Sequence, residues 1–358
     1  MKYNFDEIIE RRGTNSYKWD LVKEDEVIPM WVADMDFPTA PAIIEALQKR
    51  VAHGIFGYTL VPDSYYEAII NWFSRRHQWN IERDWILYTS GVVPALSCTL
   101  KAITMPGEKV LVQTPVYNCF FSSIKNNGCE VVENELRRVG NCTYEIDFED
   151  FERKCADEIH CELVMPGYHY TPFASISEAC RDNSVTLNSP TKAFNIAGLQ
   201  IANIICSDAA LRRRIDRAIN INEVCDVNPF GVIALQAAYN EGEEWLDELN
   251  QYLWENYQAL KEFFTTELPQ VRVTRLEGTY LVWLDILGIE LSSDEAYEQL
   301  MQDGKVFVNS GTLYGRKAGQ GFLRVNIACP RKTLMQGLAR IGRVLSQYIE
   351  DEDTGCPM

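Results

Sequence analysis

The chain has 358 residues, of which 46% are hydrophobic and 24% charged, a composition typical of a globular protein with a large core and not of a disordered chain. Its formal net charge of −17 opposes binding to nucleic acid or to anionic lipid, because both attractions need a positive field. No apolar run has signal-peptide length at the N-terminus, and none reaches the roughly 18 residues that span a bilayer, so we expect a cytoplasmic protein.

The cysteines and histidines give no metal or disulfide signature. The eleven cysteines are scattered and never spaced Cys-x-x-Cys, and the four histidines form no His-x-x-x-His pair. We therefore expect no metal site, and we interpret most cysteines as small buried side chains.

The first part of the chain predicts helices that alternate with short strands. An irregular segment to about residue 37 precedes a helix that Gly54 breaks, and a second helix with one apolar face follows over 63–77. A strand over 85–89 then meets Ser90-Gly91-Val92-Val93, which opens another helix. Unpaired N–H groups at such a junction bind phosphate well, so Gly91, Val92 and Val93 are candidates, although many α/β turns contain Ser-Gly.

Tyr117 follows the next predicted strand. That strand covers 109–112, and a helix over 118–127 and a strand over 130–136 complete the unit. Open α/β sheets bind ligands beyond the carboxyl ends of their strands, which makes Tyr117 a candidate ligand contact. It could equally be a core aromatic residue.

Lys192 lies in a short polar segment between predicted strands over 184–188 and 201–206. To act as a nucleophile its ammonium must lose a proton near neutral pH, which requires burial or a neighbouring cation. Ser189, three residues earlier, could hold a phosphate oxygen. Taken alone, Lys192 could equally be a solvated loop lysine.

The last part of the chain predicts a smaller α+β domain. Helices over 209–221, 229–239 and 243–268 are followed, after Pro269, by four predicted strands and a closing helix over 332–349. Arg324 stands inside the strand predicted over 322–327, among apolar neighbours. Its guanidinium suits a carboxylate ligand, and a buried salt bridge is the alternative.

Three segments carry a resemblance to a known family. Ser189-Pro190-Thr191-Lys192-Ala193-Phe194-Asn195 with Ala197-Gly198-Leu199-Gln200 resembles the cofactor-lysine segment of pyridoxal-phosphate enzymes with the aspartate-aminotransferase fold (PLP fold type I). Within them it is most similar to carbon–sulfur β-lyases of the MalY/PatB, or cystathionine β-lyase, type. The match runs from Trp31-Val32-Ala33-Asp34-Met35-Asp36-Phe37 to Gly321–Arg331.

The resemblance implies both an architecture and a set of site residues. It implies an α/β large domain over 50–255 with a mixed, mainly parallel sheet, and a smaller α+β domain formed by 1–49 and 256–358. Lys192 would bind pyridoxal 5'-phosphate and Asp157 would accept the pyridine N–H. Tyr117 would stack on the ring, and Arg324 would bind the substrate α-carboxylate. The phosphate would be held by Gly91, Val92, Val93 and Ser189, and by Tyr58 of the neighbouring subunit in a homodimer with a shared active site.

Two of these assignments have ordinary structural alternatives. Asp157 begins a polar run after the helix predicted over 148–156, so it could equally be a surface helix cap. Tyr58 could pack under the glycine turn that precedes it.

The chain departs from the family between Ala156 and Asp157. Family members carry there a strand, an Asn-Pro-containing turn, a helix and most of a second strand, a unit of roughly 30 or more residues. Its loss removes the asparagine that normally binds the ring hydroxyl, and we expect the interrupted sheet to expose apolar edges. A natural deletion and an artefact of the gene sequence both remain open.

The implied activity is β-elimination on cystathionine or cysteine conjugates, which gives a thiol, pyruvate and ammonia. Gln200 stands where aminotransferases of this fold usually carry an arginine, and the lyase branch tolerates that change. An aminotransferase of the same fold is one alternative. A catalytically impaired regulatory or binding protein is the other, because of the missing segment.

Overall fold

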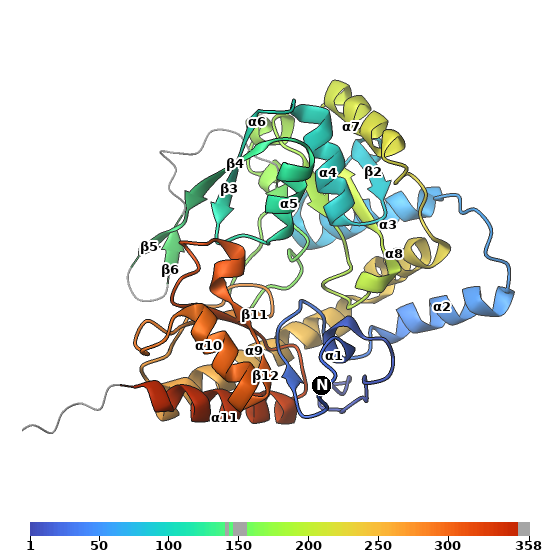
Figure 1. Ribbon diagram of the computed structural model, residues 1–358. Coiled ribbons are helices and arrows are strands. Elements are labelled where there is room, and N and C mark those ends of the chain that lie inside the picture. Colours follow the sequence, from blue (N-terminus) through green and yellow to red (C-terminus); the bar gives the residue numbers. More distant parts are fainter. Residues whose placement is uncertain (140–142, 146–155, 350–358) are drawn as a thin grey trace, which may run out of the picture.

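The computed structural model describes residues 1–139, 143–145 and 156–349 (Figure 1). The helix predicted over 148–156 falls outside these residues except for its last position. The described chain forms two parts, drawn above and below one another in Figure 1, and the long helix α9 (Glu243–Glu267) extends into the lower part.

The strands of the upper part form two separate sheets. The first has the order β2 (Ile86–Thr89), β9 (Ala202–Ile205), β8 (Thr186–Asn188), β7 (Ala156–Asp157), in which β9 is antiparallel to both neighbours and β7 is parallel to β8. The second is the parallel pair of β3 (Lys109–Thr114) and β4 (Glu130–Glu135). The described strands therefore include both parallel and antiparallel pairs, as predicted, but they are divided between two sheets.

Helices cover both sheets because each buries one apolar face. Helix α4 (Val92–Ile103) packs against β8, β9 and the helices α5 (Cys119–Asn126) and α7 (Ala209–Ile221). The remaining helices of this part are α2 (Pro41–His53), α3 (Asp63–His77), α6 (Glu178–Asp182) and α8 (Pro229–Glu241). Between α3 and α8 the buried rings of Trp72 and Tyr239 stack with centroids 4.9 Å apart.

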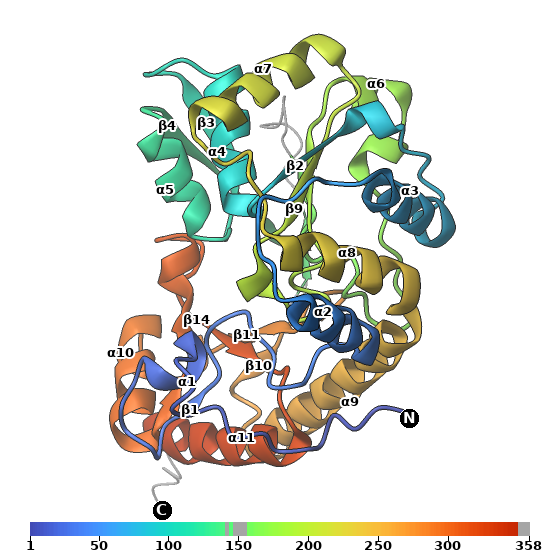
Figure 2. The same cartoon turned by 90° about the vertical axis from the view of Figure 1, so that its right-hand side faces the viewer.

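The lower part is the predicted α+β unit. Its antiparallel sheet has the order β10 (Arg272–Val273), β11 (Leu281–Asp285), β14 (Phe322–Asn326), β13 (Asn309–Ser310). Helices α10 (Ser293–Gln299) and α11 (Arg331–Leu345) lie in the same part (Figure 2). The hairpin of β5 (Arg137–Val139) and β6 (Thr143–Glu145) forms a separate pair outside these three sheets.

The N-terminal segment joins this lower part. Strand β1 (Ile28–Pro29) pairs in parallel with β12 (Val306–Phe307), after the single helical turn α1 (Tyr17–Asp20). The predicted domain limits at 49/50 and 255/256 fall inside α2 and α9, and the division stays a prediction. Within the described ranges no helix combines the length and apolarity needed to cross a membrane.

Candidate active site

The topology of the first sheet brings three segments to one edge. Thr89 at the end of β2 pairs with Ala202, and Asn188 at the end of β8 pairs with Asn203, the next residue of β9. The chain therefore leaves β2 toward Gly91 and leaves β8 toward Lys192 at the same edge. Asp157 ends β7 there too, because it pairs with Leu187. Residues 35 to 101 positions apart thus gather because their strands end together.

Lys192 is partly buried and its amine is held by the main chain. Nζ donates a hydrogen bond of 2.7 Å to the carbonyl oxygen of Ala33. Burial lowers the pKa of Lys192 and Arg324 adds to the effect, against the opposing influence of Asp34 and Asp157. A lysine in this environment releases its proton more readily than a solvated one, so the solvated-loop alternative does not describe it.

Asp157 is a carboxyl shielded from solvent beside that amine. Burial raises its pKa to about 6, while a hydrogen bond of 3.1 Å from the Ile159 N–H and the charge of Lys192 act in the opposite direction. The carboxyl is therefore ready for a positively charged partner that would stabilise its ionised form.

The raised pKa of Asp157 predicts a pH-dependent stability in the cofactor-free protein. A carboxyl whose folded pKa is about 6 and whose unfolded pKa is 3.8 destabilises the fold progressively as pH rises through this window. Between pH 5 and pH 8 the free energy of unfolding of the native protein should fall by about 1.4 kcal/mol relative to that of Asp157→Asn, which cannot ionise. Urea unfolding of both proteins at the two pH values measures the difference, with exposed Asp84→Asn as the matched control. A difference that does not change with pH would contradict the burial of this carboxyl.

Arg324 is buried, with 8% of its surface exposed, and it lies on β14 (Phe322–Asn326) close enough to Lys192 to act on its charge. Its Nη2 donates to the carbonyl of Trp31 at 3.0 Å, and the guanidinium lies 4.1 Å from the ring centre of Tyr314. Nε has no hydrogen-bond partner, and no carboxylate of the described residues forms an ion pair with this arginine. The buried salt bridge considered from the sequence is therefore absent from this part of the chain, and the guanidinium is available to an anionic ligand.

Tyr117 lies near Arg324 and is 47% exposed, so it is not a core residue. Desolvation and the neighbouring Cys119 raise the pKa of its hydroxyl, which keeps the phenol neutral. An exposed neutral ring at the end of β3 is compatible with stacking on a planar ligand, and that role stays a prediction.

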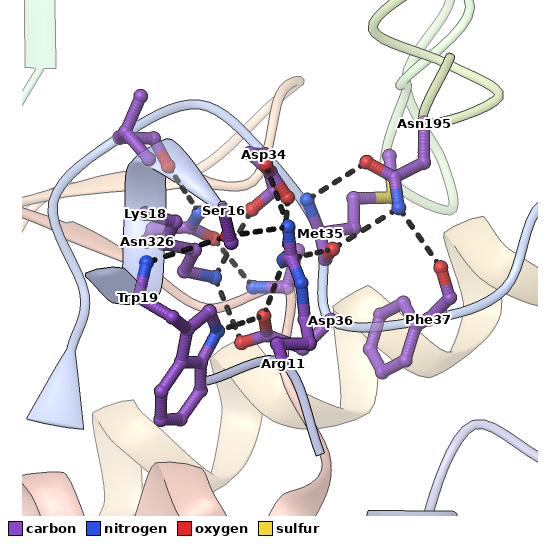
Figure 3. A network of polar contacts seen from close by, with 12 residues as sticks. Arg11, Ser16, Lys18, Trp19, Asp34, Met35, Asp36, Phe37, Asn195 and Asn326 are labelled. Atoms are coloured by element: carbon purple, nitrogen blue, oxygen red, sulfur yellow. Dashed lines mark hydrogen bonds and ion pairs between the residues drawn. The ribbon is translucent and has the colours of Figure 1, made fainter. Parts of the chain in front are cut away.

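The loop 31–37 is clamped by side chains from both parts of the molecule (Figure 3). Asn195 accepts from the Met35 N–H at 3.0 Å and donates to the carbonyls of Met35 and Phe37. Asn326 donates to the carbonyls of Val32 and Asp34, both at 2.7 Å. The loop therefore holds the Ala33 carbonyl in a fixed place for Lys192.

Two acidic residues of the same loop are paired with the partly buried Arg11 and the buried Lys18. Arg11 contacts Asp34 and Asp36 at 2.7 Å each, and Lys18 contacts Asp36 at 2.8 Å (Figure 3). Buried charges are tolerated only when they are paired in this way. The network ties the N-terminal segment to the site.

Sequence reasoning missed the roles of Asn195, Asn326 and the Ala33 carbonyl. The segments were recognised as carriers of a family resemblance, but these contacts join residues 158 to 294 positions apart, which no local pattern reveals. His160 contacts Thr279 at 3.1 Å. Burial lowers the pKa of His160 to about 3, so this ring is neutral at physiological pH.

The remaining candidates are not brought to Lys192 by any described contact. Gly91 caps α4, and Val92 and Val93 open its first turn, as predicted. The Ser189 hydroxyl is buried and donates to the Ile201 carbonyl at 2.6 Å, so it would have to turn to hold a phosphate. Tyr58 is fully exposed, 101%, and lies outside the site of its own chain. The phosphate-binding roles of these residues stay predictions.

Comparison with known proteins identifies the family. The model of the aminotransferase class I and II family matches residues 25–164 and 155–341. The chain belongs to this family.

Characterised relatives cover nearly the whole chain. Cystathionine beta-lyase PatB of Bacillus subtilis is 38% identical over 388 residues, covering 96% of this chain and all of the relative. The crystal structure of cystalysin from Treponema denticola, which contains a pyridoxal 5'-phosphate cofactor, has a TM-score of 0.92 at 31% identity and covers 97% of this chain and all of that one. The PLP-bound C-S lyase of Staphylococcus hominis has a TM-score of 0.87 at 30% identity, covering 96% and 98%.

The same comparisons bear on the missing segment. The family model matches in two pieces that overlap at residues 155–164, around the junction of Ala156 and Asp157. In the PatB alignment, 96% of the 358 residues is about 344, so roughly 44 of the 388 aligned positions have no residue of this chain. Both findings agree with the absence of an internal segment from this chain.

Proposed function

We propose that this protein is a pyridoxal-phosphate-dependent carbon–sulfur β-lyase that acts on cystathionine or a cysteine conjugate. The observation that carries the proposal is the placement of Lys192, with its lowered pKa, in electrostatic contact with both Asp157 and Arg324. Such an activity would serve sulfur amino-acid metabolism, including methionine biosynthesis, in the cytoplasm.

The residues present fit the cofactor. A partly buried amine with a lowered pKa suits covalent attachment, and a pyridinium would stabilise the ionised form of Asp157, whose pKa burial raises to about 6. Lys192 would hold the cofactor carbon, Asp157 its ring nitrogen, Tyr117 its ring face, and the start of α4 its phosphate. When bound, the cofactor supplies an electron sink for negative charge that develops at the substrate Cα.

The side chains of this protein would perform the remaining work. Arg324 binds the substrate α-carboxylate with two parallel N–H donors and orients the Cα–H bond. Lys192 Nζ, freed by the substrate amine, removes the Cα proton as a general base. The bond between Cβ and sulfur then breaks, the sulfur leaves with the electron pair as a thiolate, and water completes the release of pyruvate and ammonia.

Pyruvate release separates this proposal from the aminotransferase alternative. The purified protein with pyridoxal phosphate should form pyruvate, ammonia and a thiol from cystathionine without any added keto acid. An aminotransferase would instead require a keto acid and convert it to an amino acid. Gln200, exposed where an arginine would be expected in an aminotransferase, favours the lyase. Cofactor binding without either reaction would support the impaired, regulatory alternative.

The exposure of Tyr58 supports a homodimer whose active sites are shared. Residues 54–60 are exposed almost throughout, and the fully exposed Tyr58 makes no contact with Lys192 of its own chain. We infer that its hydroxyl donates to the phosphate bound by the partner subunit. A hydrogen bond to a charged group contributes about 1.5–3 kcal/mol, so Tyr58→Phe should weaken cofactor binding roughly tenfold to hundredfold.

Cofactor titration of the apoprotein, followed by sedimentation at micromolar concentration, tests this inference. Tyr17→Phe, an exposed tyrosine in the N-terminal segment, is the matched control and should bind the cofactor normally. A monomer with full cofactor occupancy would overturn the shared site.

A further inference from the structure

The two sheets of the upper part each present an unpaired edge to the space between them. Among the described residues β3 pairs only with β4, and β7 pairs only with β8. In both views the pair β3–β4 lies apart from β2 and β9 (Figures 1 and 2). The edges are those of β3 and β7.

A large apolar cavity lies between these edges. Its volume is about 1300 Å³, and it is bordered by β3 along its length, by α4 and α5, and by Asp157 of β7. The apolar part of its wall includes Leu96, Leu100, Val110, Leu111, Val185 and Leu211. The space is partly open to solvent, and its walls are mainly apolar.

The backbone groups of β3 that face the cavity can be deduced from its ladder. The carbonyl of Glu108 accepts from the Glu130 N–H at 2.9 Å, and the carbonyl of Thr114 accepts from the Leu136 N–H at 2.9 Å. In a parallel ladder alternate residues bond to the same neighbour. Even-numbered residues therefore face β4, and Lys109, Leu111 and Gln113 direct their N–H and C=O groups to the open edge.

The other edge shows the same pattern. The Glu158 N–H donates to the Leu187 carbonyl at 2.9 Å, so the backbone groups of the preceding residue, Asp157, point away from β8. On the β3 side the buried amide nitrogen of Gln113 has no hydrogen-bond partner. Open strand edges readily pair with a further strand, so both edges can accept a partner.

The two open strands run in the same direction. Tyr117, just past the end of β3, lies close to Arg324, and Asp157, at the end of β7, lies close to Lys192, which itself interacts with Arg324. Both strands therefore end at the edge that holds the site. A strand placed between them would pair in parallel with both.

We propose that this cavity is a strand-binding site, which accepts an extended apolar segment of another polypeptide as a parallel strand between β3 and β7. The two edges supply main-chain hydrogen bonds, as in other cases of strand addition. Because Leu96 and Leu100 of α4 line the space, the inserted segment should present apolar side chains to them, and we expect a run rich in valine, isoleucine and threonine without proline. The two pieces of the family match overlap at residues 155–164, a range that includes β7.

A synthetic peptide tests the proposal on the full-length protein. The probe is an acetylated, amidated ten-residue peptide with six central valine, isoleucine and threonine residues between pairs of lysine. It should bind one to one and raise the thermal unfolding midpoint by roughly 5 °C at a hundredfold excess over its Kd. A peptide of the same charge with two central residues replaced by proline is the control for attraction to the acidic protein, and it should not bind.

Variants of the open edge supply the second part of the test. Leu111→Pro removes one N–H from the open edge of β3 and none from its ladder with β4, so it should weaken peptide binding about tenfold or more. Leu111→Ala keeps that N–H and should weaken binding much less. If Leu111→Pro fails to fold, peptides N-methylated at alternate positions provide the same test. They remove N–H donors from the peptide instead of from β3, and they should bind more weakly.

Several outcomes would overturn the proposal. These are equal binding of the proline peptide, the absence of saturable binding, or an unchanged unfolding midpoint at saturation. Conversion of an oligomer to a monomer by the peptide would show that a second copy of this chain, and not a separate segment, occupies the cavity, which also overturns it. Because none of these readouts requires catalysis, the proposal can fail or succeed independently of the lyase activity.

Discussion

Lys192→Ala should abolish pyruvate release and covalent cofactor binding while leaving the fold intact. The amine is the group we expect to hold the cofactor and to remove the Cα proton, and loss of a positioned general base alone costs up to about 10⁴-fold. The side chain is partly buried and its amine donates a hydrogen bond to the Ala33 carbonyl, so its removal opens little of the core. The expected loss in kcat is therefore about 10⁴-fold or more.

Two measurements separate a catalytic from a structural effect of this substitution. Borohydride reduction and peptide mapping should place the cofactor on Lys192 in the native protein, and the variant should show no reducible adduct. Lys101→Ala removes an exposed lysine that contacts Asn222 and should change neither activity nor labelling. An adduct on any other lysine would contradict the assignment.

Much of the fold was predictable because local periodicity determined it. The apolar face over 63–77 predicts α3 to the residue, and the predicted strand over 130–136 is β4 with one residue fewer. Shorter elements were less predictable, since the first of the four strands predicted after Pro269 has only two residues, Arg272–Val273 of β10. Two residues carry too little pattern to mark where pairing with a neighbour ends.

The site was only partly predictable, for a different physical reason. Lys192, Asp157 and Arg324 stand in recognisable segments, and the structure brings them together. The clamp on the 31–37 loop is made by single amide side chains such as Asn326, bonded to carbonyls nearly 300 residues earlier. A backbone carbonyl has no sequence signature, so contacts of this kind become visible only in three dimensions.

Arg324→Lys should lower kcat/KM for cystathionine roughly tenfold to hundredfold. Lysine keeps the charge but cannot make two parallel hydrogen bonds to one carboxylate, and each such charge-assisted bond contributes about 1.5–3 kcal/mol. The loss should appear mainly in KM if the carboxylate is bound equally in the ground and transition states. Arg272→Lys, at an exposed position of β10, is the matched control and should leave kcat/KM unchanged.

Arg324→Ala should also move the pH dependence of the reaction, which a purely packing role would not do. Arg324 is one of the groups that lower the pKa of Lys192, so its removal should raise that pKa. A base with a higher pKa is deprotonated only at higher pH, and the acidic limb of the kcat profile should therefore shift toward alkaline pH. Arg324→Lys retains the positive charge and should show a smaller shift. If both variants lose activity with an unchanged profile, Arg324 does not lie close enough to the reacting amine to act on it, and its place as the carboxylate-binding residue would be wrong.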